Sequence, residues 1–180
     1  MSTFYFVRHG KSEANEAGVI ADETPALAIE GIEQARKVGT DLQDKGIKAV
    51  VCSPYLRARQ TAQIIADQIG LTAGHIIVID ELRERGLGDK EGGPKDEPSN
   101  WYFEADNTHG VEPRLDVLER MYRCINGIEL IMAKLNGPVV VVGHAVSGFY
   151  LLQAAKGVTI PELMDSPSEL GNAQCIAVEL

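Results

Sequence analysis

At 180 residues, the chain is long enough to bury one hydrophobic core and too short to suggest two substantial domains. Hydrophobic residues make up 44% of the sequence and charged residues 24%, which argues against a disordered protein. The net charge of -9 argues against a protein that binds nucleic acid or an anionic membrane, because such proteins usually present basic surfaces. We therefore expect a single domain, 1–180, whose positive potential is confined to a pocket.

The first predicted strand is an apolar run that ends abruptly on reactive side chains. Residues 4–7 read FYFV, and Arg8, His9 and Gly10 follow at once. In open α/β sheets, ligands bind outside the carboxyl ends of the strands. This ending therefore places a cation and an imidazole where a substrate can reach them.

A second strand is predicted at 49–52, after a segment with helical apolar spacing at 32–42. It ends at a Ser-Pro pair, and helical spacing resumes over 58–69. Arg57 and Arg59 lie just beyond the strand, so this segment brings two more guanidinium groups to a strand exit.

An irregular region, rich in Gly, Pro, Asp and Asn, runs over residues 85–112. A loop this long in a compact domain usually has a function or contains a short element. The candidate element is 99–105, with Trp101, Tyr102 and Phe103 on one turn. These aromatic side chains either cover the site at the strand ends or seal the edge of the core, and the sequence leaves both readings open.

The longest predicted helix spans 115–135, and its apolar stripe is typical of core packing. Four valines at 139–142 then predict a strand buried on both faces, which ends on Gly143 and His144. This alternation of strands and helices predicts a three-layer α/β/α sandwich around a mostly parallel sheet. Glycines that could end helices in the left-handed conformation are Gly46, Gly70, Gly137 and Gly157.

Three strands thus deliver Arg8, His9, Arg57 and His144 to strand exits. Planar guanidinium groups bind phosphate oxygens bidentately, and a neutral imidazole supplies a nitrogen nucleophile, so this combination suits a phosphoryl group. Nearby cations also disfavour protonation of His9, and we expect its lone pair to be free near neutral pH.

These motifs resemble those of the histidine phosphatase superfamily, also called phosphoglycerate mutase-like. The Arg8-His9-Gly10 run with Asn15 downstream is similar to the family's Arg-His-Gly signature and its phosphate-binding Asn. Residues 53–62 resemble the segment that supplies the second arginine. Similar matches to the second histidine motif and to the closing strand are found at 142–144 and 172–178.

The resemblance also implies a proton donor, which we assign to Glu84 in the 82–85 segment. Glu81 and Glu91 lie near enough in sequence to compete for this role. The catalytic residues implied by the resemblance are His9, Glu84, Arg8, Arg57 and His144. The residues implied to bind the substrate phosphate are Arg8, Asn15, Arg57, His144 and Ala145.

Three departures from the family pattern are visible. Ala145 stands where the family commonly has Gly, and Ala28 stands where the family often has Thr, which removes a hydroxyl that could cap a helix. Residues 16–25 lack the glycine-containing pattern of the mutases, so their substrate contacts are not carried over.

The resemblance implies a metal-independent phosphatase that hydrolyses phosphate monoesters through a phosphohistidine on His9, with no cofactor. One alternative is a cofactor-dependent phosphoglycerate mutase, although the mutases that this core resembles are longer. Another is a non-catalytic module that binds phosphorylated ligands. The expected partner is a small-molecule phosphate ester, and the physiological substrate and the oligomeric state stay open.

The cysteines and the N-terminal segment bear on the compartment. Cys52, Cys124 and Cys175 are an odd set without paired spacing, so we expect reduced thiols and no metal site. No signal-like or membrane-spanning apolar run is present. We therefore expect a cytoplasmic protein, with a cap-like segment inserted at about 85–112.

Overall fold

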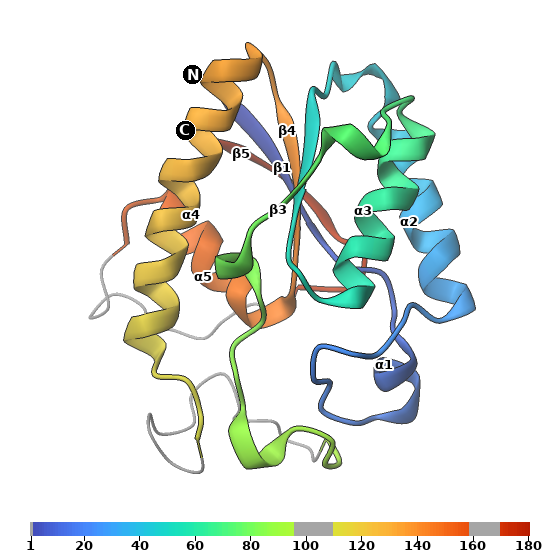
Figure 1. Ribbon diagram of the computed structural model, residues 1–180, viewed down its shortest axis with the longest axis vertical. Coiled ribbons are helices and arrows are strands. Elements are labelled where there is room, and N and C mark those ends of the chain that lie inside the picture. Colours follow the sequence, from blue (N-terminus) through green and yellow to red (C-terminus); the bar gives the residue numbers. More distant parts are fainter. Residues whose placement is uncertain (1, 96–109, 159–169) are drawn as a thin grey trace.

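The computed structural model describes residues 2–95, 110–158 and 170–180. Within these ranges, five strands form one sheet in the order β3-β2-β4-β1-β5 (Figure 1). Neighbouring strands are parallel except for β1 and β5, which are antiparallel. The strands are β1 (Thr3–Arg8), β2 (Ala49–Cys52), β3 (Ile76–Val78), β4 (Val139–Gly143) and β5 (Cys175–Glu179).

Helices cover both faces of the sheet (Figure 1). Helices α2 and α3 lie on one face, and α4 and α5 lie on the other. This arrangement confirms the predicted three-layer α/β/α fold with a mostly parallel sheet. The helices are α1 (Glu13–Ala17), α2 (Ile29–Asp41), α3 (Leu56–Gln68), α4 (Arg114–Leu135) and α5 (Ala145–Ala155).

The valine run of β4 shows why its strand pattern is continuous rather than alternating. Val139 and Val141 belong to the hydrophobic core beneath α4 and α5, whereas Val140 and Val142 belong to the core beneath α2 and α3. A central strand covered by helices on both faces has no polar side to show. The apolar run is therefore the direct signature of the middle layer.

Helix ends agree with the sequence predictions except at one position. Gly46, Gly70 and Gly157 have φ values of 66°, 75° and 70°, as expected for left-handed residues at helix ends. The prediction for Gly137 is wrong, because Asn136 with φ 52° ends α4 instead. Asn is the non-glycine residue that tolerates this conformation most readily, since its short polar side chain can bond locally. Helix α2 begins after Ala28, which makes no side-chain cap.

The chain leaves β1 and β4 toward opposite faces of the sheet. These strands are neighbours, with Arg8 opposite Gly143 in register. After β1 and the short helix α1, the chain enters α2, which packs beside α3. After β4 it enters α5, which packs beside α4. Because the chain leaves the two strands toward opposite faces, their carboxyl ends border the position at which open α/β sheets bind ligands.

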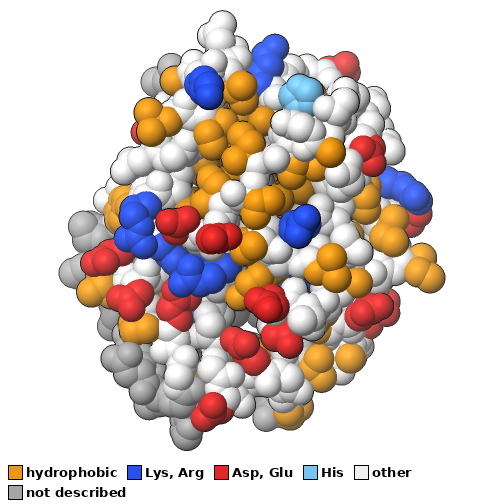
Figure 2. All heavy atoms as spheres, in the orientation of Figure 1, with side chains coloured by type: hydrophobic (Ala, Val, Ile, Leu, Met, Phe, Trp, Pro, Cys, Tyr) orange, Lys and Arg blue, Asp and Glu red, His pale blue; other side chains and the backbone are white. Residues whose placement is uncertain are grey.

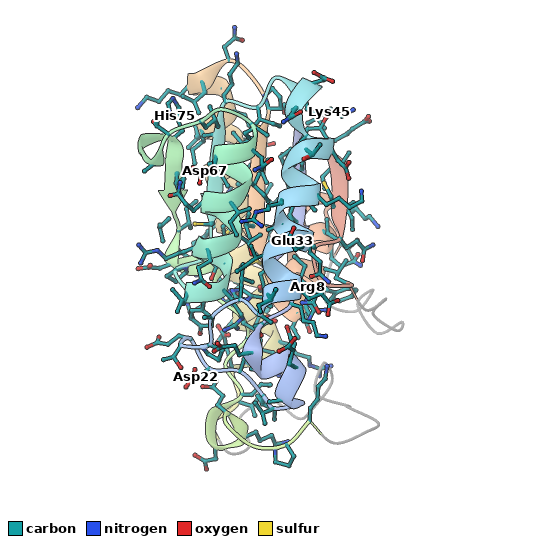
Figure 3. The ribbon with its side chains drawn as sticks, turned by 90° about the vertical axis from the view of Figure 1, so that its right-hand side faces the viewer. Arg8, Asp22, Glu33, Lys45, Asp67 and His75 are labelled. Atoms are coloured by element: carbon teal, nitrogen blue, oxygen red, sulfur yellow. The ribbon has the colours of Figure 1, made fainter. Side chains whose placement is uncertain are left out.

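The residues that follow β1 lie at one end of the molecule. Figure 3 shows Arg8 and Asp22 toward the end of the molecule where α1 lies, whereas His75 and Lys45 lie toward the opposite end. Acidic side chains are spread over the face seen in Figure 2, and Lys and Arg side chains lie among them.

No helix in the described part of the chain is both long and apolar enough to cross a membrane. The aromatic segment 99–105 falls outside the described residues.

Candidate active site

His9 follows β1 directly and is buried, with 4% of its surface exposed. Its backbone N–H donates to the Gly143 carbonyl at 3.0 Å, which continues the register of β1 and β4. Its Nδ1 lies 2.7 Å from the Gly10 carbonyl oxygen. A carbonyl can only accept, so Nδ1 carries the proton, and Nε2 accepts from Arg57 Nε at 3.2 Å. The unprotonated nitrogen of His9 therefore faces Arg57.

The environment of His9 keeps the imidazole neutral. Burial lowers the pKa of His9 well below its usual 6.5, and the charges of Arg57 and Arg8 lower it further. The direction confirms the expectation from the sequence. The structure adds that burial, and not the neighbouring cations, is the larger cause.

Gly10 is required by a close approach to α2. A Cβ at this position would lie 2.3 Å from the Gly31 carbonyl oxygen. The Gly10 N–H donates to Thr61 Oγ1 at 3.1 Å, and the Thr61 hydroxyl donates in turn to the Arg57 carbonyl at 2.8 Å. These contacts hold the backbone of Gly10, the residue whose carbonyl orients the imidazole ring of His9.

Arg57 lies in the first turn of α3 and is buried. Besides its bond to His9, it donates through Nη1 to the Asp22 carbonyl. Its guanidinium lies over the Tyr55 ring, 5.1 Å from the ring centre, a cation–π geometry. A loop carbonyl and an aromatic ring thus hold the cation against His9.

His144 lies beside His9 and is not among the residues that line the pocket. It is fully buried, and its ring centre lies 5.2 Å from that of His9. Its Nε2 is 2.7 Å from Ser53 Oγ, and Nδ1 has no partner within the ranges that the structure describes. Burial, followed by the charge of Arg57, lowers the pKa of His144 well below 6.5. Contact of His144 with a phosphate stays a prediction.

The side-chain amide of Asn15 is oriented by two neighbours. Its Oδ1 accepts from Ser12 N at 3.1 Å and from Asn172 Nδ2 at 3.2 Å. With the oxygen occupied, the two Nδ2 hydrogens stay available to an anion in the pocket that Asn15 lines. Asn172 also donates to the His9 carbonyl at 3.3 Å. The sequence marked Asn172 only as part of the closing motif, and its positioning contacts depend on tertiary structure.

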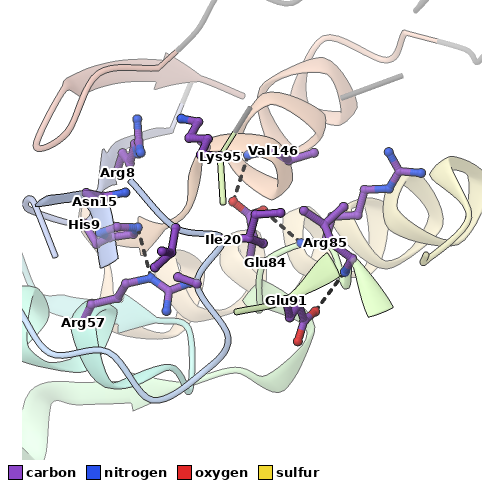
Figure 4. Close-up of a pocket in the computed structure, with 14 residues that line it drawn as sticks. Arg8, His9, Asn15, Ile20, Arg57, Glu84, Arg85, Glu91, Lys95 and Val146 are labelled. Carbon is purple, nitrogen blue, oxygen red and sulfur yellow. Dashed lines mark hydrogen bonds between the residues drawn. The ribbon is translucent and has the colours of Figure 1, made fainter. Parts of the chain in front are cut away.

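Glu84 faces the pocket from a segment without regular secondary structure, between two short 3₁₀ turns (Figure 4). Its Oε2 accepts from Val146 N at 3.1 Å, and its Oε1 accepts from Ser147 N at 2.7 Å and from Arg85 N at 2.9 Å. Two of these donors belong to the first turn of α5, where the helix dipole favours a negative charge. The carboxylate is thus held by backbone amides on the far side of the pocket from Arg57.

The two rival glutamates are placed differently. Glu81 does not line the pocket. Glu91 does line it, but its Oε1 accepts from Leu87 N at 2.9 Å within its own turn. The structure therefore leaves Glu84 as the carboxylate anchored beside α5. The predicted site residues that line one pocket are Arg8, His9, Asn15, Arg57, Glu84 and Ala145.

An outer wall of the pocket was missed by sequence reasoning. Ile20 N donates to the Gly93 carbonyl, and Gly92 N donates to the Ile20 carbonyl, both at 2.9 Å. Ile20 and Leu87 also share a small apolar cluster, and Lys95 lines the pocket near them. No local pattern could have revealed this pairing, because it joins two irregular segments far apart in the sequence.

No cluster of three or more His, Cys, Asp or Glu side chains in residues 2–95, 110–158 and 170–180 is arranged to hold a metal ion. All three cysteines are free. Burial raises the pKa of Cys52 to about 11 and that of Cys124 to about 12, so both thiols stay protonated near neutral pH. Cys175 is exposed on β5.

A neutral imidazole beside two arginines at the switch point of an α/β sheet is an arrangement typical of enzymes that act on phosphate groups. Comparison with known proteins agrees. The model of the histidine phosphatase superfamily, branch 1, matches residues 4–180, and the chain belongs to this superfamily.

Individual relatives place the chain among phosphatases and mutases. It is 31% identical over 169 residues to a Bacillus subtilis protein named uncharacterized phosphatase PhoE, covering 92% of this chain and 83% of that one. It is 30% identical over 119 residues to the 2,3-bisphosphoglycerate-dependent phosphoglycerate mutase of Thermoplasma acidophilum, covering 65% of this chain and 58% of the mutase. The superfamily to which the chain belongs thus includes relatives named as phosphatases and relatives named as mutases.

The fold is also found in solved structures. A mycobacterial glucosyl-3-phosphoglycerate phosphatase, solved with VO3, superposes with a TM-score of 0.83 at 24% identity. The match covers 98% of this chain and 90% of that one. This likeness shows the same fold.

Proposed function

We propose that the protein hydrolyses small phosphate monoesters in two steps, through a phosphohistidine formed on Nε2 of His9. The observation that carries this proposal is the tautomer of the buried ring. Nδ1–H donates to the Gly10 carbonyl, which leaves the Nε2 lone pair pointing toward Arg57 and the pocket. Burial keeps that lone pair unprotonated.

The phosphoryl group would lie among the donors that surround His9. Arg8 and Arg57 supply guanidinium groups, Asn15 supplies its Nδ2 hydrogens, and Ala145 supplies the first backbone N–H of α5. When a phosphate oxygen replaces Nε2 as the acceptor for Arg57, the attacking lone pair becomes free. This exchange of the acceptor of Arg57 thus both binds the substrate and frees Nε2 of His9 for attack.

In the first step, Nε2 forms a bond to phosphorus while the bond from phosphorus to the ester oxygen breaks. Glu84 donates its proton to the departing alkoxide. Three amides occupy three of the four lone-pair sites of this carboxylate, and the remaining site, on Oε2, can carry the proton. The Gly10 carbonyl stabilises the positive charge that develops at Nδ1–H.

In the second step, water attacks phosphorus, and ionised Glu84 accepts the proton of that water. The Nε2–phosphorus bond breaks, inorganic phosphate leaves, and the neutral imidazole is restored. The guanidinium groups stabilise charge on the non-bridging oxygens, which is the task that a divalent cation performs in other phosphoryl-transfer enzymes. The proposed reaction therefore needs no metal ion.

The outer wall is the part of the pocket that would contact the leaving group. Ile20 and Leu87 offer apolar surface, and Lys95 offers a positive charge. Leu87 and Lys95 belong to the inserted segment at about 85–112, so these two residues support the proposal that this segment caps the pocket. A panel of phosphate esters with apolar and with anionic leaving groups would rank these contacts by released phosphate.

Trapping of the intermediate tests the mechanism. Brief exposure to a ³²P-labelled ester followed by a denaturing quench should label the protein, and the label should be labile in acid and stable in base. His9→Gln should abolish the label, whereas His75→Gln, a change at an exposed histidine, should retain it. Turnover without any labelled protein, or an acid-stable label, would contradict the proposal.

The mutase relative provides a specific second candidate. A mutase must pass the phosphoryl group to a second substrate hydroxyl before water arrives. For the proposed phosphatase, incubation of 3-phosphoglycerate with 2,3-bisphosphoglycerate should release inorganic phosphate, and any 2-phosphoglycerate formed should not exceed the phosphate released. Conversion to 2-phosphoglycerate faster than phosphate release would favour the mutase.

A further inference from the structure

Arg120, on the inward face of α4, is a buried cation that does not line the pocket. Only 2% of its surface is exposed. Its Nη1 donates to the Arg83 carbonyl at 2.8 Å and to the Glu81 carbonyl, and its Nη2 donates to the Glu84 carbonyl at 3.2 Å. One guanidinium thus holds three backbone carbonyls of the segment that carries the proposed acid.

Glu112 completes this arrangement just before α4. Its Oε1 accepts from Arg120 Nε at 2.8 Å, and its Oε2 accepts from Arg120 Nη2 at 2.9 Å. The same carboxylate accepts from the Gly86 N–H at 3.1 Å and from Arg83 Nη2 at 3.1 Å. The pair therefore reaches the backbone on both sides of Glu84.

The hydrogen bonds of Arg120 show that the Arg120–Glu112 pair holds the backbone of residues 81–84. A guanidinium has five N–H donors, and the five bonds that Arg120 makes all go to Glu112 or to carbonyls of residues 81–84. Burial raises the pKa of Glu112, but its hydrogen bonds with Arg120 and Gly86 and the charges of Arg120 and Arg83 outweigh this effect, and the net direction is downward. The guanidinium of Arg120 thus favours the charged form of the Glu112 carboxylate, and all five of its hydrogen bonds are used within this arrangement.

The segment around Glu84 is tied to Glu112 by two further bonds, from Arg85 Nε to the Glu112 carbonyl and from Glu112 N to the Gly86 carbonyl, both at 2.8 Å. It lies between the 3₁₀ turns Asp80–Leu82 and Gly88–Lys90, outside any helix or strand ladder. The amides of α5 fix the Glu84 carboxylate, but they cannot fix the backbone from which it extends. A displacement of about 1 Å can cost on the order of 10²-fold in rate when a catalytic group must meet a reacting atom.

We propose that Arg120 and Glu112 are positioning residues that set the distance of the Glu84 carboxyl group from the ester oxygen. This inference rests on the proposed function, in which Glu84 is the proton donor. A buried ion pair is weak evidence for stability, since apolar replacements are often as stable. The geometry points to placement of the acid as the use of this pair.

The test is the dependence of kcat/KM on the leaving group. An alkyl phosphate needs protonation of its leaving oxygen, whereas 4-nitrophenyl phosphate needs little. The ratio kcat/KM reports the steps up to formation of the phosphoenzyme, so the later water-activating role of Glu84 does not enter it. Arg120→Lys keeps the charge but cannot reproduce the five-donor fork.

We expect Arg120→Lys to lower kcat/KM for the alkyl phosphate by roughly 10- to 100-fold and to leave 4-nitrophenyl phosphate within about threefold. Arg123→Lys, the matched change at an exposed position of the same helix, should affect neither substrate. Equal losses of Arg120→Lys on the two substrates would show a merely structural role and overturn the proposal.

A double-mutant cycle separates this inference from the proposed function. In a Glu84→Gln background, Arg120→Lys should cause no further loss on the alkyl phosphate, because the acid that it positions is already absent. Independent, multiplying losses would overturn the positioning role. If Glu84→Gln alone lost activity equally on both esters, the assignment of the acid would fail instead, which is a distinguishable result.

Glu112→Gln provides a second variant of unchanged shape in case Arg120→Lys does not fold. It should show the same selective loss on the alkyl phosphate, while Glu119→Gln, at an exposed site on α4, should not. Circular dichroism and thermal unfolding of each variant would establish that the folded state is retained. A folded Glu112→Gln with an unchanged ratio between the two esters would overturn the proposal.

Discussion

The two sides of the pocket are held in place by different means. On one side, His9 follows β1 and bonds directly to the end of β4, so the register of two central strands places the proposed nucleophile. On the other side, Glu84 lies in an irregular segment and is placed by backbone amides and by Arg120. The comparison teaches that strand register places the proposed nucleophile, whereas the proposed acid is placed by backbone amides of α5 and by a side chain of α4.

The two sides also differ in their exposure to solvent. His9 is buried and neutral, while Glu84 is partly exposed at the pocket surface. A buried nucleophile is protected from protonation, and an accessible carboxyl group can exchange its proton between the two proposed steps. The sides should therefore fail in different ways when each is altered.

The largest expected effect is on the nucleophile side. His9→Ala should lower turnover by on the order of 10⁴-fold or more, because no other group can form the phosphoenzyme. Inorganic phosphate should still bind, as the arginines remain. Steady-state kinetics and isothermal titration with phosphate would measure the two effects, with His75→Ala as the control. Substantial residual turnover would remove His9 from the nucleophile role.

The next largest effect is on the acid side and should be selective. Glu84→Gln should lower kcat/KM for an alkyl phosphate by roughly 10²- to 10⁴-fold and for an activated aryl phosphate by less than about tenfold. Glu81→Gln, a matched change in the same segment but away from the pocket lining, should leave both values unchanged. If Glu81→Gln gave the selective loss instead, the two glutamates would have to exchange roles.

The buried histidines should make stability depend on pH. Burial first, and Arg57 second, lowers the pKa of His9 and of His144 well below 6.5 in the folded state. Below about pH 6.5 the unfolded chain binds protons that the folded chain does not, so the free energy of unfolding should fall with falling pH, by up to about 1.4 kcal/mol per pH unit for each histidine. Above that pH this contribution is fully present.

Urea unfolding of the wild type and of His9→Ala over this acidic range would measure the difference in slope. The variant should depend less steeply on pH, because it lacks one of the two histidines whose protonation favours unfolding. Identical slopes would mean that His9 titrates normally in the folded protein.

The smallest expected effect is that of metal removal. Neither side of the pocket is proposed to use a cation, so incubation with EDTA followed by gel filtration should leave kcat/KM unchanged. Added magnesium should likewise have no effect on the treated enzyme. Loss of activity on chelation, restored by a divalent metal, would overturn the metal-free reaction on both sides at once.

Much of the nucleophile side could be predicted from the sequence. The apolar run of β1 ending on Arg8 and His9, and the valines of β4 ending at His144, place reactive groups at strand exits because strand patterns are local. The neutrality of His9 was also predictable in direction. The Asn136 helix end was not, since Gly137 next to it offers the more usual residue for that conformation.

The sequence by itself determined the layers, the strand ends and the residue types that follow those ends, because apolar runs and the residues that end them are local features of the chain. Only the tertiary structure decided that Glu84 rather than Glu81 lines the pocket, that Asn172 orients Asn15, and that Arg120 supports the acid segment. These choices join residues separated by tens of positions. They depend on how loops cross the end of the sheet, which short-range periodicity does not encode.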